Sequence, residues 1–288
     1  MRNQESNSYD TVSPHCHGSE KKPIEIYKFI DPFCPDCWAI EPVIKKLLIE
    51  YGRYFSIKHV LSGRLKNLNR VKKRRTAFIY NHCAELEHHA GIQWIENPIS
   101  SPYIASIAIK AAELQGRKLC ARFIRQLQEK IFLGKENIEK FSVLQECAKQ
   151  VGLDVDEFIS DIHSDSVAKA FQCDLKITVE MDVQEIPTLV FFNENIEEEG
   201  IKISGAYPYE VYEQIIEEML EEKPVPATPP PIEAFLKYFK LVATKEISIV
   251  YNMPIEKAET ELKKLQLKQL VESVPVKNGM FWRYLKND

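Results

Sequence analysis

The spacing of apolar and polar residues changes several times along the chain and predicts its elements in order. From Pro23 onward, apolar residues alternate with polar ones over residues 24–30, as in a half-buried strand. The spacing becomes helical over 38–51 and alternates again over 54–61. A strand, a helix and a second strand in this order predict a βαβ unit, and therefore an α/β domain.

A long helical stretch follows this unit. Residues 65–180 show almost only the apolar spacing of amphipathic helices. Strand signals return at 188–192, which is rich in β-branched and aromatic residues, and near 201–204, and a last helix is predicted over 208–222. The sequence therefore predicts one domain over residues 23–222, in which a helical insert interrupts the sheet.

Prolines mark the end of this domain. Five of the chain's 16 prolines stand within eight positions of the segment 223–231. Proline fixes its own backbone angle and lacks an amide donor, so this segment is predicted to be an extended, semi-rigid spacer. A domain boundary belongs here.

The residues after the spacer, 232–288, predict a small winged-helix module of α+β class, with three helices and a terminal hairpin. The turn of the hairpin carries Asn-Gly, the strongest short turn signal. The expected elements are helices at about 232–243, at 244–250 with Thr244 as its cap, and after Pro254 to about Leu267, and strands at 270–275 and 280–285 around Asn278-Gly279.

Composition and charge restrict the class of protein. The net charge of -4 over 288 residues is too small to predict a nucleic-acid or membrane partner. No apolar run approaches the roughly 20 residues of a membrane helix and the polar start shows no signal peptide, so a cytoplasmic protein is expected. Seven cysteines, an odd number, indicate mostly reduced thiols. Cys120, Cys147 and Cys173 lie in helical patterns and are expected to be buried apolar residues.

The motif that carries chemistry is Cys34-Pro35-Asp36-Cys37, between the first strand and the following helix. A thiol at a helix N-terminus lies at the positive end of the helix dipole, which is the geometry of a thioredoxin-type redox centre. Cys34 is then the exposed, attacking thiol and Cys37 the resolving one. A nearby carboxylate disfavours a second negative charge, so Asp36 is expected to raise the pKa of Cys34 and weaken any oxidising power.

A proline immediately before a later strand is the second diagnostic feature, in Glu185-Ile186-Pro187-Thr188. In thioredoxin folds such a proline is cis and faces the cysteine pair, where the neighbouring backbone accepts an extended peptide. Pro187 is therefore the candidate for a client-binding groove. The alternative, a cysteine pair within a zinc site, would need a second ligand pair at matching spacing, and the sequence has none.

These motifs resemble those of a known family. A thioredoxin core with a long helical insert resembles the DsbA family, and residues 31–37, Asp-Pro-Phe-Cys-Pro-Asp-Cys, are similar to its FrnE-like cytosolic branch, as is Gly152-Leu153-Asp154 ahead of Ile186-Pro187-Thr188. With a His15-Cys16-His17 arm and a C-terminal module as well, the sequence resembles, over essentially its full length, the SpxH (YjbH) adaptors of Gram-positive bacteria.

The resemblance implies an adaptor that delivers the transcription regulator Spx to the ClpXP protease, rather than an enzyme. In this resemblance Cys34, Cys37 and Pro187 match positions of the family's motifs. The resemblance does not imply that the two thiols catalyse repeated thiol-disulfide exchange. Redox or stress modulation through them is left open. The alternative function is that of a cytosolic DsbA- or FrnE-like thiol-disulfide oxidoreductase. An adaptor would bind its client by surface complementarity and raise the client's local concentration at the protease.

The N-terminal arm, residues 1–22, has few large apolar residues and is predicted to be disordered. Members of the family are similar in having a His/Cys-rich N-terminus associated with zinc, here His15, Cys16 and His17. Three adjacent ligands cannot complete a tetrahedral site alone, so an oxidation-sensitive tail is the alternative, and no other cofactor is expected.

Two polar clusters in the predicted insert have ordinary explanations. Seven cations lie between Arg64 and Arg75 and form either a solvated face or a platform for an acidic partner. No two of His82, Cys83, His88 and His89 are placed on one helix face, which favours ordinary core or surface roles.

A winged helix invites a DNA-binding hypothesis, but the third helix of the module mixes carboxylates with its lysines, which would weaken contact with phosphates. No nucleic-acid partner is expected, and a DNA-binding regulator is only a third candidate. Phe281, Trp282 and Tyr284 could anchor packing on the first domain or an interface, and packing is the expected role. Residues 23–222 alone are expected to hold the client, because 232–288 offer only a small, charge-balanced surface.

Overall fold

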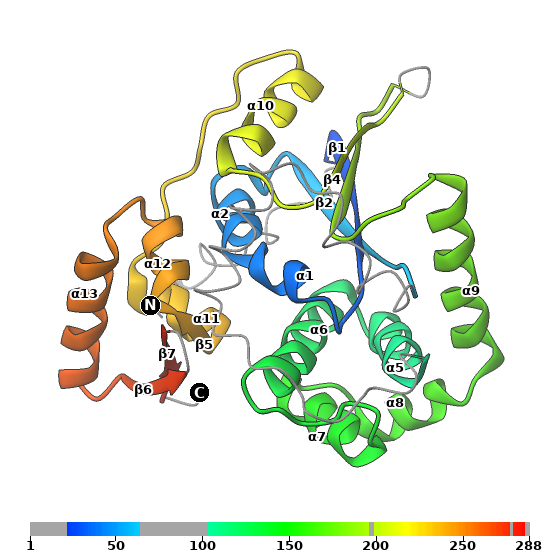
Figure 1. The fold of residues 1–288 in the computed structure, drawn as a ribbon, viewed down its shortest axis with the longest axis horizontal. Coiled ribbons are helices and arrows are strands. Elements are labelled where there is room, and N and C mark those ends of the chain that lie inside the picture. The colour runs from blue at the N-terminus through cyan, green and yellow to red at the C-terminus, as the bar shows by residue number, and fades with distance from the viewer. Residues whose placement is uncertain (1–21, 64–102, 196–198, 277–278, 286–288) are drawn as a thin grey trace, which may run out of the picture.

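The computed structural model describes residues 22–63, 103–195, 199–276 and 279–285. They form an α/β domain and a C-terminal module, defined as residues 232–276 and 279–285, which lies against one side of that domain (Figure 1). In the described residues, no helix has the length and apolar character needed to cross a membrane. The predicted features at the N-terminal arm (His15, Cys16 and His17), the basic run 64–75, His82 to His89 and Asn278 lie outside the described residues.

A four-stranded sheet forms the centre of the α/β domain. Its strands are β1 (Ile24–Ile30), β2 (Phe55–Leu61), β3 (Thr188–Phe192) and β4 (Ile201–Ser204), in the order β2-β1-β3-β4. Strand β1 pairs parallel with β2 and antiparallel with β3, which pairs antiparallel with β4. The predicted thioredoxin-type α/β fold is confirmed, and the insert enters the chain between β2 and β3.

Two helices, rather than the single predicted one over 38–51, follow β1. Helix α1 (Pro35–Ala39) begins directly after Cys34, and α2 (Glu41–Tyr51) begins after Ile40. Pro42 stands in the first turn of α2, where its missing amide is tolerated but cannot continue the hydrogen bonds of α1. The break therefore turns the chain so that α1 carries the cysteine motif at the end of the sheet while α2 packs along it.

Both faces of the sheet are covered. Helices α2 and α10 (Tyr209–Leu220) share one apolar core with β1 and β3. The second core includes residues of the other face and of the described helices of the insert, which lie within the predicted stretch 65–180 (Figure 1). These helices are α5 (Tyr103–Leu114), α6 (Arg117–Phe132), α7 (Phe141–Val151), α8 (Val155–Ile162) and α9 (Asp165–Glu180).

The Gly152-Leu153-Asp154 motif is a turn between α7 and α8. Gly152 ends α7 with φ at 86°, a left-handed conformation that suits glycine. The next amide, of Leu153, returns to the carbonyl of Ala148, and the Leu153 side chain is buried. Asp154 then caps α8 by accepting from the amide of Glu157 at 3.0 Å. The motif that resembles the DsbA branch therefore has a structural role in the insert.

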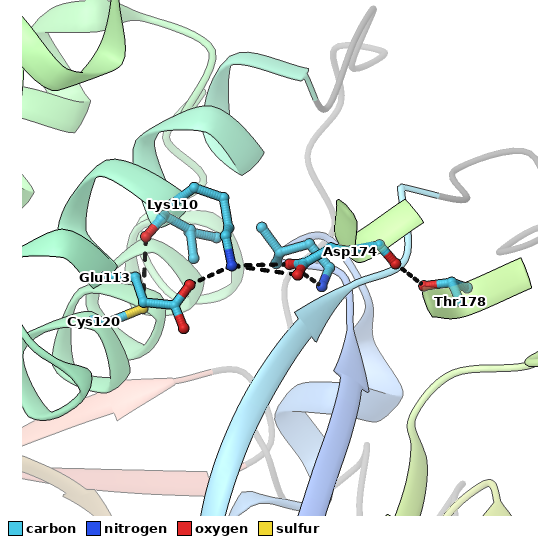
Figure 2. Close-up of polar contacts among 7 residues, drawn as sticks. Lys110, Glu113, Cys120, Asp174 and Thr178 are labelled. Atoms are coloured by element: carbon cyan, nitrogen blue, oxygen red, sulfur yellow. Dashed lines mark hydrogen bonds and ion pairs between the residues drawn. The ribbon is translucent and has the colours of Figure 1, made fainter. Parts of the chain in front are cut away.

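A buried polar cluster fixes the insert to the sheet (Figure 2). Lys110 of α5 points between Glu113 and Asp174, and it lies 3.2 Å from a carboxylate oxygen of Asp174 on α9. The same carboxylate accepts from the amide of Leu61, at the end of β2, at 3.0 Å. Because Lys110 and Asp174 are both buried, each compensates the other's lost hydration, and together they hold α5, α9 and β2 in place.

The C-terminal module contains three helices and a three-stranded antiparallel sheet of order β5-β7-β6. The chain order is helix, strand, helix, helix, strand, strand. The elements are α11 (Ile232–Phe239), β5 (Leu241–Ala243), α12 (Thr244–Val250), α13 (Ile255–Leu267), β6 (Val271–Val276) and β7 (Gly279–Tyr284).

Two predictions within this module are wrong. The first helix does not reach residue 243, because Lys240 takes a left-handed φ of 64° and residues 241–243 pair with β7. Thr244 does not cap α12 through its side chain. Its hydroxyl instead accepts from the Trp282 indole at 2.9 Å and donates to the Met280 carbonyl at 3.3 Å, so it connects α12 to β7.

Candidate functional site

The cysteine motif begins helix α1 at the end of strand β1. Cys34 has an extended conformation, and its sulfur accepts from the amide of Cys37 at 3.3 Å, so the thiol is the cap of the helix. Both cysteines are free thiols. The prediction that the motif joins a strand to a helix is confirmed.

The proline loop lies directly beside Cys34. The Ile186-Pro187 peptide is cis, as the sequence predicts. The Cys34 thiol donates to the carbonyl of Ile186 at 3.9 Å, a long contact for sulfur, and Thr188 continues into β3. Residues 34 and 186, far apart in the sequence, are therefore brought together, as in the predicted arrangement of a cysteine pair facing a cis proline.

The burial of the two thiols differs from the prediction of an exposed Cys34. Cys34 and Cys37 have 0% relative exposure, and Pro187 is also buried. Burial, the contact with Cys37 and the charge of Asp31 raise the pKa of the Cys34 thiol well above its usual value. The raised pKa of Cys34 agrees in direction with the expectation, with burial as its main cause and the charge of Asp31 as one contribution. The predicted effect of Asp36 stays a prediction. A neutral, buried thiol is a poor nucleophile at neutral pH.

Asp31 is a buried carboxyl three residues before Cys34. One oxygen accepts from the amide of Phe33 at 2.9 Å, and no group among the described residues hydrogen-bonds the other oxygen. Burial raises the pKa of Asp31 to about 6, although the Phe33 amide opposes the shift. The cysteine motif therefore lies next to a carboxyl group that binds a proton more tightly than an exposed aspartate.

Trp38, the residue after Cys37, is the point where three parts of the chain meet. Its ring stacks on Phe281 of β7, with centroids 6.2 Å apart and planes at 20°, and also packs against Phe132 of α6 at 6.0 Å. The guanidinium of Arg125 lies 3.7 Å from the ring centroid, within range of a cation–π contact. Helix α1 is thus covered by the insert and by the C-terminal module together.

A buried ionic cluster connects the same three parts. Glu246 of α12 pairs with Lys45 of α2 through one oxygen and with Arg125 of α6, at 2.8 Å, through the other. Arg125 also reaches Glu129 at 3.0 Å. Burial opposes ionisation of Glu246, but Arg125 and Lys45 outweigh it and hold the pKa of this carboxyl below its usual range. Glu246 is therefore the one residue of the cluster that the C-terminal module supplies.

The proline-rich segment is extended, as predicted, but it is attached along the end of α2. The amide of Ala227 donates to the carbonyl of Glu50 at 2.8 Å. Arg53 donates to the carbonyl of Val225 at 2.6 Å, and the hydroxyl of Tyr251 donates to the carbonyl of Pro230 at 2.7 Å. Both ends of the segment are therefore hydrogen-bonded to the domains that they join.

The remaining predictions concern three further cysteines and a metal site. Cys120 and Cys147 are buried, as predicted, whereas Cys173 is exposed on α9. The prediction for Cys173 is wrong because a helical pattern does not by itself say which face a small residue occupies. Within the described residues, no group of three or more potential ligands could hold a metal. Zinc at His15, Cys16 and His17 stays a prediction.

Sequence reasoning missed Arg125 and Glu246, which make the ionic contacts beside the site. Helix α6 also carries the exposed Arg117 and Lys118, and α12 the half-buried Lys245, so no local pattern distinguishes the two residues. Phe281 is the exception, because an apolar aromatic residue in the last strand was expected to serve packing, and it packs on the first domain through Trp38.

Comparisons with known proteins agree with this architecture. The family model described as "Thioredoxin" matches residues 27–214. A ClpXP adapter protein SpxH from Bacillus subtilis is 49% identical over 94% of this chain and 92% of its own length. Proteins of the same name from Halalkalibacterium halodurans and Bacillus cereus are 49% and 43% identical, over 97% and 100% of this chain and 94% and 99% of their own lengths.

Solved structures with a similar fold are more distant in sequence. A Nitrosomonas europaea protein described as a protein disulfide isomerase has a TM-score of 0.56 at 19% identity, and it covers 70% of this chain and 98% of its own. A Streptomyces coelicolor protein described as a DsbA oxidoreductase has a TM-score of 0.53 at 16% identity, with 72% and 100% covered. These two likenesses establish the DsbA-like fold alone.

Proposed function

The chain belongs to the SpxH family of ClpXP adapter proteins, and we propose that it is a cytoplasmic adaptor that binds an Spx-type transcription regulator and promotes its degradation by ClpXP. In this proposal the chain recognises its client without covalent chemistry. The ClpXP protease is the second partner, and neither a membrane nor a nucleic acid takes part.

The observation that carries the proposal is the extent of the sequence match. The two oxidoreductase-type structures are covered almost completely, but they account for only 70% and 72% of this chain. The SpxH relatives match 94% to 100% of it. The SpxH relatives therefore match this chain over almost its whole length, which includes the C-terminal module. The two solved structures share with it only the thioredoxin-type fold.

The geometry of the thiols supports an adaptor over a cytosolic thiol-disulfide oxidoreductase, the alternative function. A redox enzyme needs an accessible thiolate to attack its substrate. Here Cys34 is buried, and burial, Cys37 and Asp31 raise its pKa. The chain thus keeps the cysteine motif and the cis proline in a setting that disfavours thiolate chemistry.

We assign the C-terminal module to the winged-helix class, and we assign it a protein-contacting role. Its chain order, helix, strand, helix, helix, strand, strand, supports the class. On the exposed third helix, α13, Lys263 pairs with Glu259 at 2.8 Å and Lys264 with Glu261 at 2.7 Å. Lysines that are already paired with neighbouring carboxylates offer little net charge to phosphates, so DNA is a poor ligand.

Reconstituted degradation tests the proposed function. Purified ClpXP is given an Spx-type client with and without the full-length chain, and the client's half-life is measured. The chain should shorten that half-life, and so should a Cys34→Ala, Cys37→Ala double variant. A loss of more than about tenfold in the variant, equivalent to about 1.4 kcal/mol of coupling, would place the thiols at the centre of the mechanism.

An insulin-reduction assay on the same preparations distinguishes the adaptor from the alternative, a thiol-disulfide oxidoreductase. The adaptor proposal expects no turnover by the wild-type chain, and sustained reduction would favour the oxidoreductase. Unchanged client half-life in the presence of the wild-type chain would refute the adaptor proposal. The assay uses the full chain, because a fragment ending near Glu222 would leave Lys45 and Arg125 without Glu246. That residues 23–222 alone hold the client stays a prediction.

A further inference from the structure

Three attachments between the C-terminal module and the first domain converge on helices α1 and α2. Phe281 stacks on Trp38, Glu246 pairs with Lys45 and Arg125, and Asn252 accepts from Lys46 at 2.6 Å. In Figure 1 the module lies beside these two helices, on the side away from the four-stranded sheet. The contact thus falls on the part of the fold that carries the cysteine motif.

The apolar part of this contact is continuous with the surroundings of the thiols. One buried cluster includes Cys34, Cys37 and Trp38 together with Leu241, Ala243 and Phe281 of the module. Val274 and Val276 of β6 pack against the same cluster from its edge. Removing the module would therefore expose apolar surface of this cluster, including the ring of Trp38, the residue after Cys37.

Among the described residues, the ion pairs of this contact involve one carboxylate of the module, that of Glu246. Glu246 is 2% exposed and neutralises two cations from the first domain, Lys45 and Arg125. Without Glu246, Arg125 would keep Glu129, but Lys45 would lose the carboxylate with which it pairs among the described residues, and a buried cation without a partner is strongly disfavoured. The contact is therefore most stable when Glu246 occupies it, and separating the module requires both Lys45 and Glu246 to be hydrated again.

We propose that the C-terminal module is a docked cover that keeps Cys34 and Cys37 from thiol-reactive compounds, and that Glu246 is the latch that holds it. In the docked state both thiols are inaccessible, and a reagent reaches them only after the module lifts from α1. The module thereby sets the reactivity of the motif from outside the thioredoxin-type domain. The inference concerns thiol access and does not depend on which client the chain binds.

Site-resolved alkylation of the full-length, reduced chain tests the cover. The chain is treated with iodoacetamide under native conditions, and mass spectrometry follows the modification of each cysteine with time. Cys173, which is exposed, is the internal reference for reagent and pH. We expect modification of Cys34 and Cys37 to be at least about tenfold slower than that of Cys173, and equal rates would overturn the proposal.

The latch is tested with Glu246→Gln, which keeps the size of the side chain and removes its charge. We expect the rate at Cys34 to rise at least about tenfold, with no change at Cys173. The matched control is Glu272→Gln in the same module, which breaks an exposed pair with Arg283 and should leave every rate unchanged. An unchanged rate at Cys34 in the Glu246 variant refutes the latch.

Loss of the whole fold would also expose Cys34, so two further measurements separate the cases. Cys120 and Cys147, buried in the insert, should stay slow in Glu246→Gln, and their parallel acceleration would show global unfolding and refute a specific latch. Asn252→Gly removes the contact with Lys46, leaves the ion pairs of Glu246 in place and suits the positive φ of 49° at this position. It should give a smaller rise at Cys34, and no rise in either variant overturns the proposal.

Discussion

Asp31→Asn should change how the stability of the protein depends on pH. Burial raises the pKa of Asp31 from 3.8 to about 6, so between these values the folded state binds a proton that the unfolded chain has released. Stability is therefore lost as the pH rises through this window. At about 1.4 kcal/mol for each pH unit, the ionised carboxyl costs the folded state about 3 kcal/mol at neutral pH.

Asparagine cannot ionise, and its side-chain oxygen can still accept from the Phe33 amide, as Asp31 does at 2.9 Å. Its amide group brings a new buried donor, which costs about 1–3 kcal/mol at every pH and does not alter the slope. The free energy of unfolding of the variant, relative to the wild type, should thus rise by about 2–3 kcal/mol from pH 4 to pH 7.

Urea denaturation of both proteins at intervals between pH 4 and pH 7 measures this difference, and subtraction cancels the other titrating groups. Asp156→Asn, which removes an exposed carboxylate from α8, shows how much of the change comes from removing one negative charge. A constant difference across the range would mean that Asp31 titrates normally, and that the setting assigned here to the cysteine motif is wrong.

Three further substitutions test the packing of the site and of the insert by urea denaturation. Phe281→Ala removes the ring that stacks on Trp38 and should cost about 3–5 kcal/mol, whereas a cost below about 1 kcal/mol would contradict a packed contact. Asp174→Asn leaves Lys110 with Glu113 alone and should cost up to about 3 kcal/mol, and a neutral result would show that Glu113 suffices. Gly63→Ala should cost at least about 1–2 kcal/mol, because its φ is 59° and a Cβ atom would lie 2.7 Å from Leu175, and no change would mean that the turn relaxes freely.

The features that the sequence predicts well are the ones that local chemistry decides. The strands at 188–192 and 201–204 are found at those residues, because alternation and β-branched side chains leave few other conformations. Helix α13 follows Pro254 and ends at Leu267, where proline and the apolar spacing place its limits. The cis bond before Pro187 is predicted by a motif and its place before a strand.

The features that the sequence does not predict depend on contacts between distant residues. The buried Cys34 belongs to an apolar cluster that includes Trp38, Phe132 and Phe281, which come from three separate parts of the chain. Glu246 occurs in a short, mixed helix, and only the positions of Lys45 and Arg125 in space make it a buried carboxylate. The ends of α11 depend similarly on the pairing of residues 241–243 with β7.

The retained cysteine motif has a structural use that does not require redox turnover. The Cys34 sulfur accepts from the amide of Cys37 and so satisfies one of the free donors at the start of α1. It also donates to the carbonyl of Ile186, which connects the helix to the proline loop. A neutral thiol performs both tasks, and a thiolate would lose the second. The raised pKa of Cys34 is therefore consistent with a motif kept for its geometry, and the cover formed by the C-terminal module preserves that neutral state by excluding water from it.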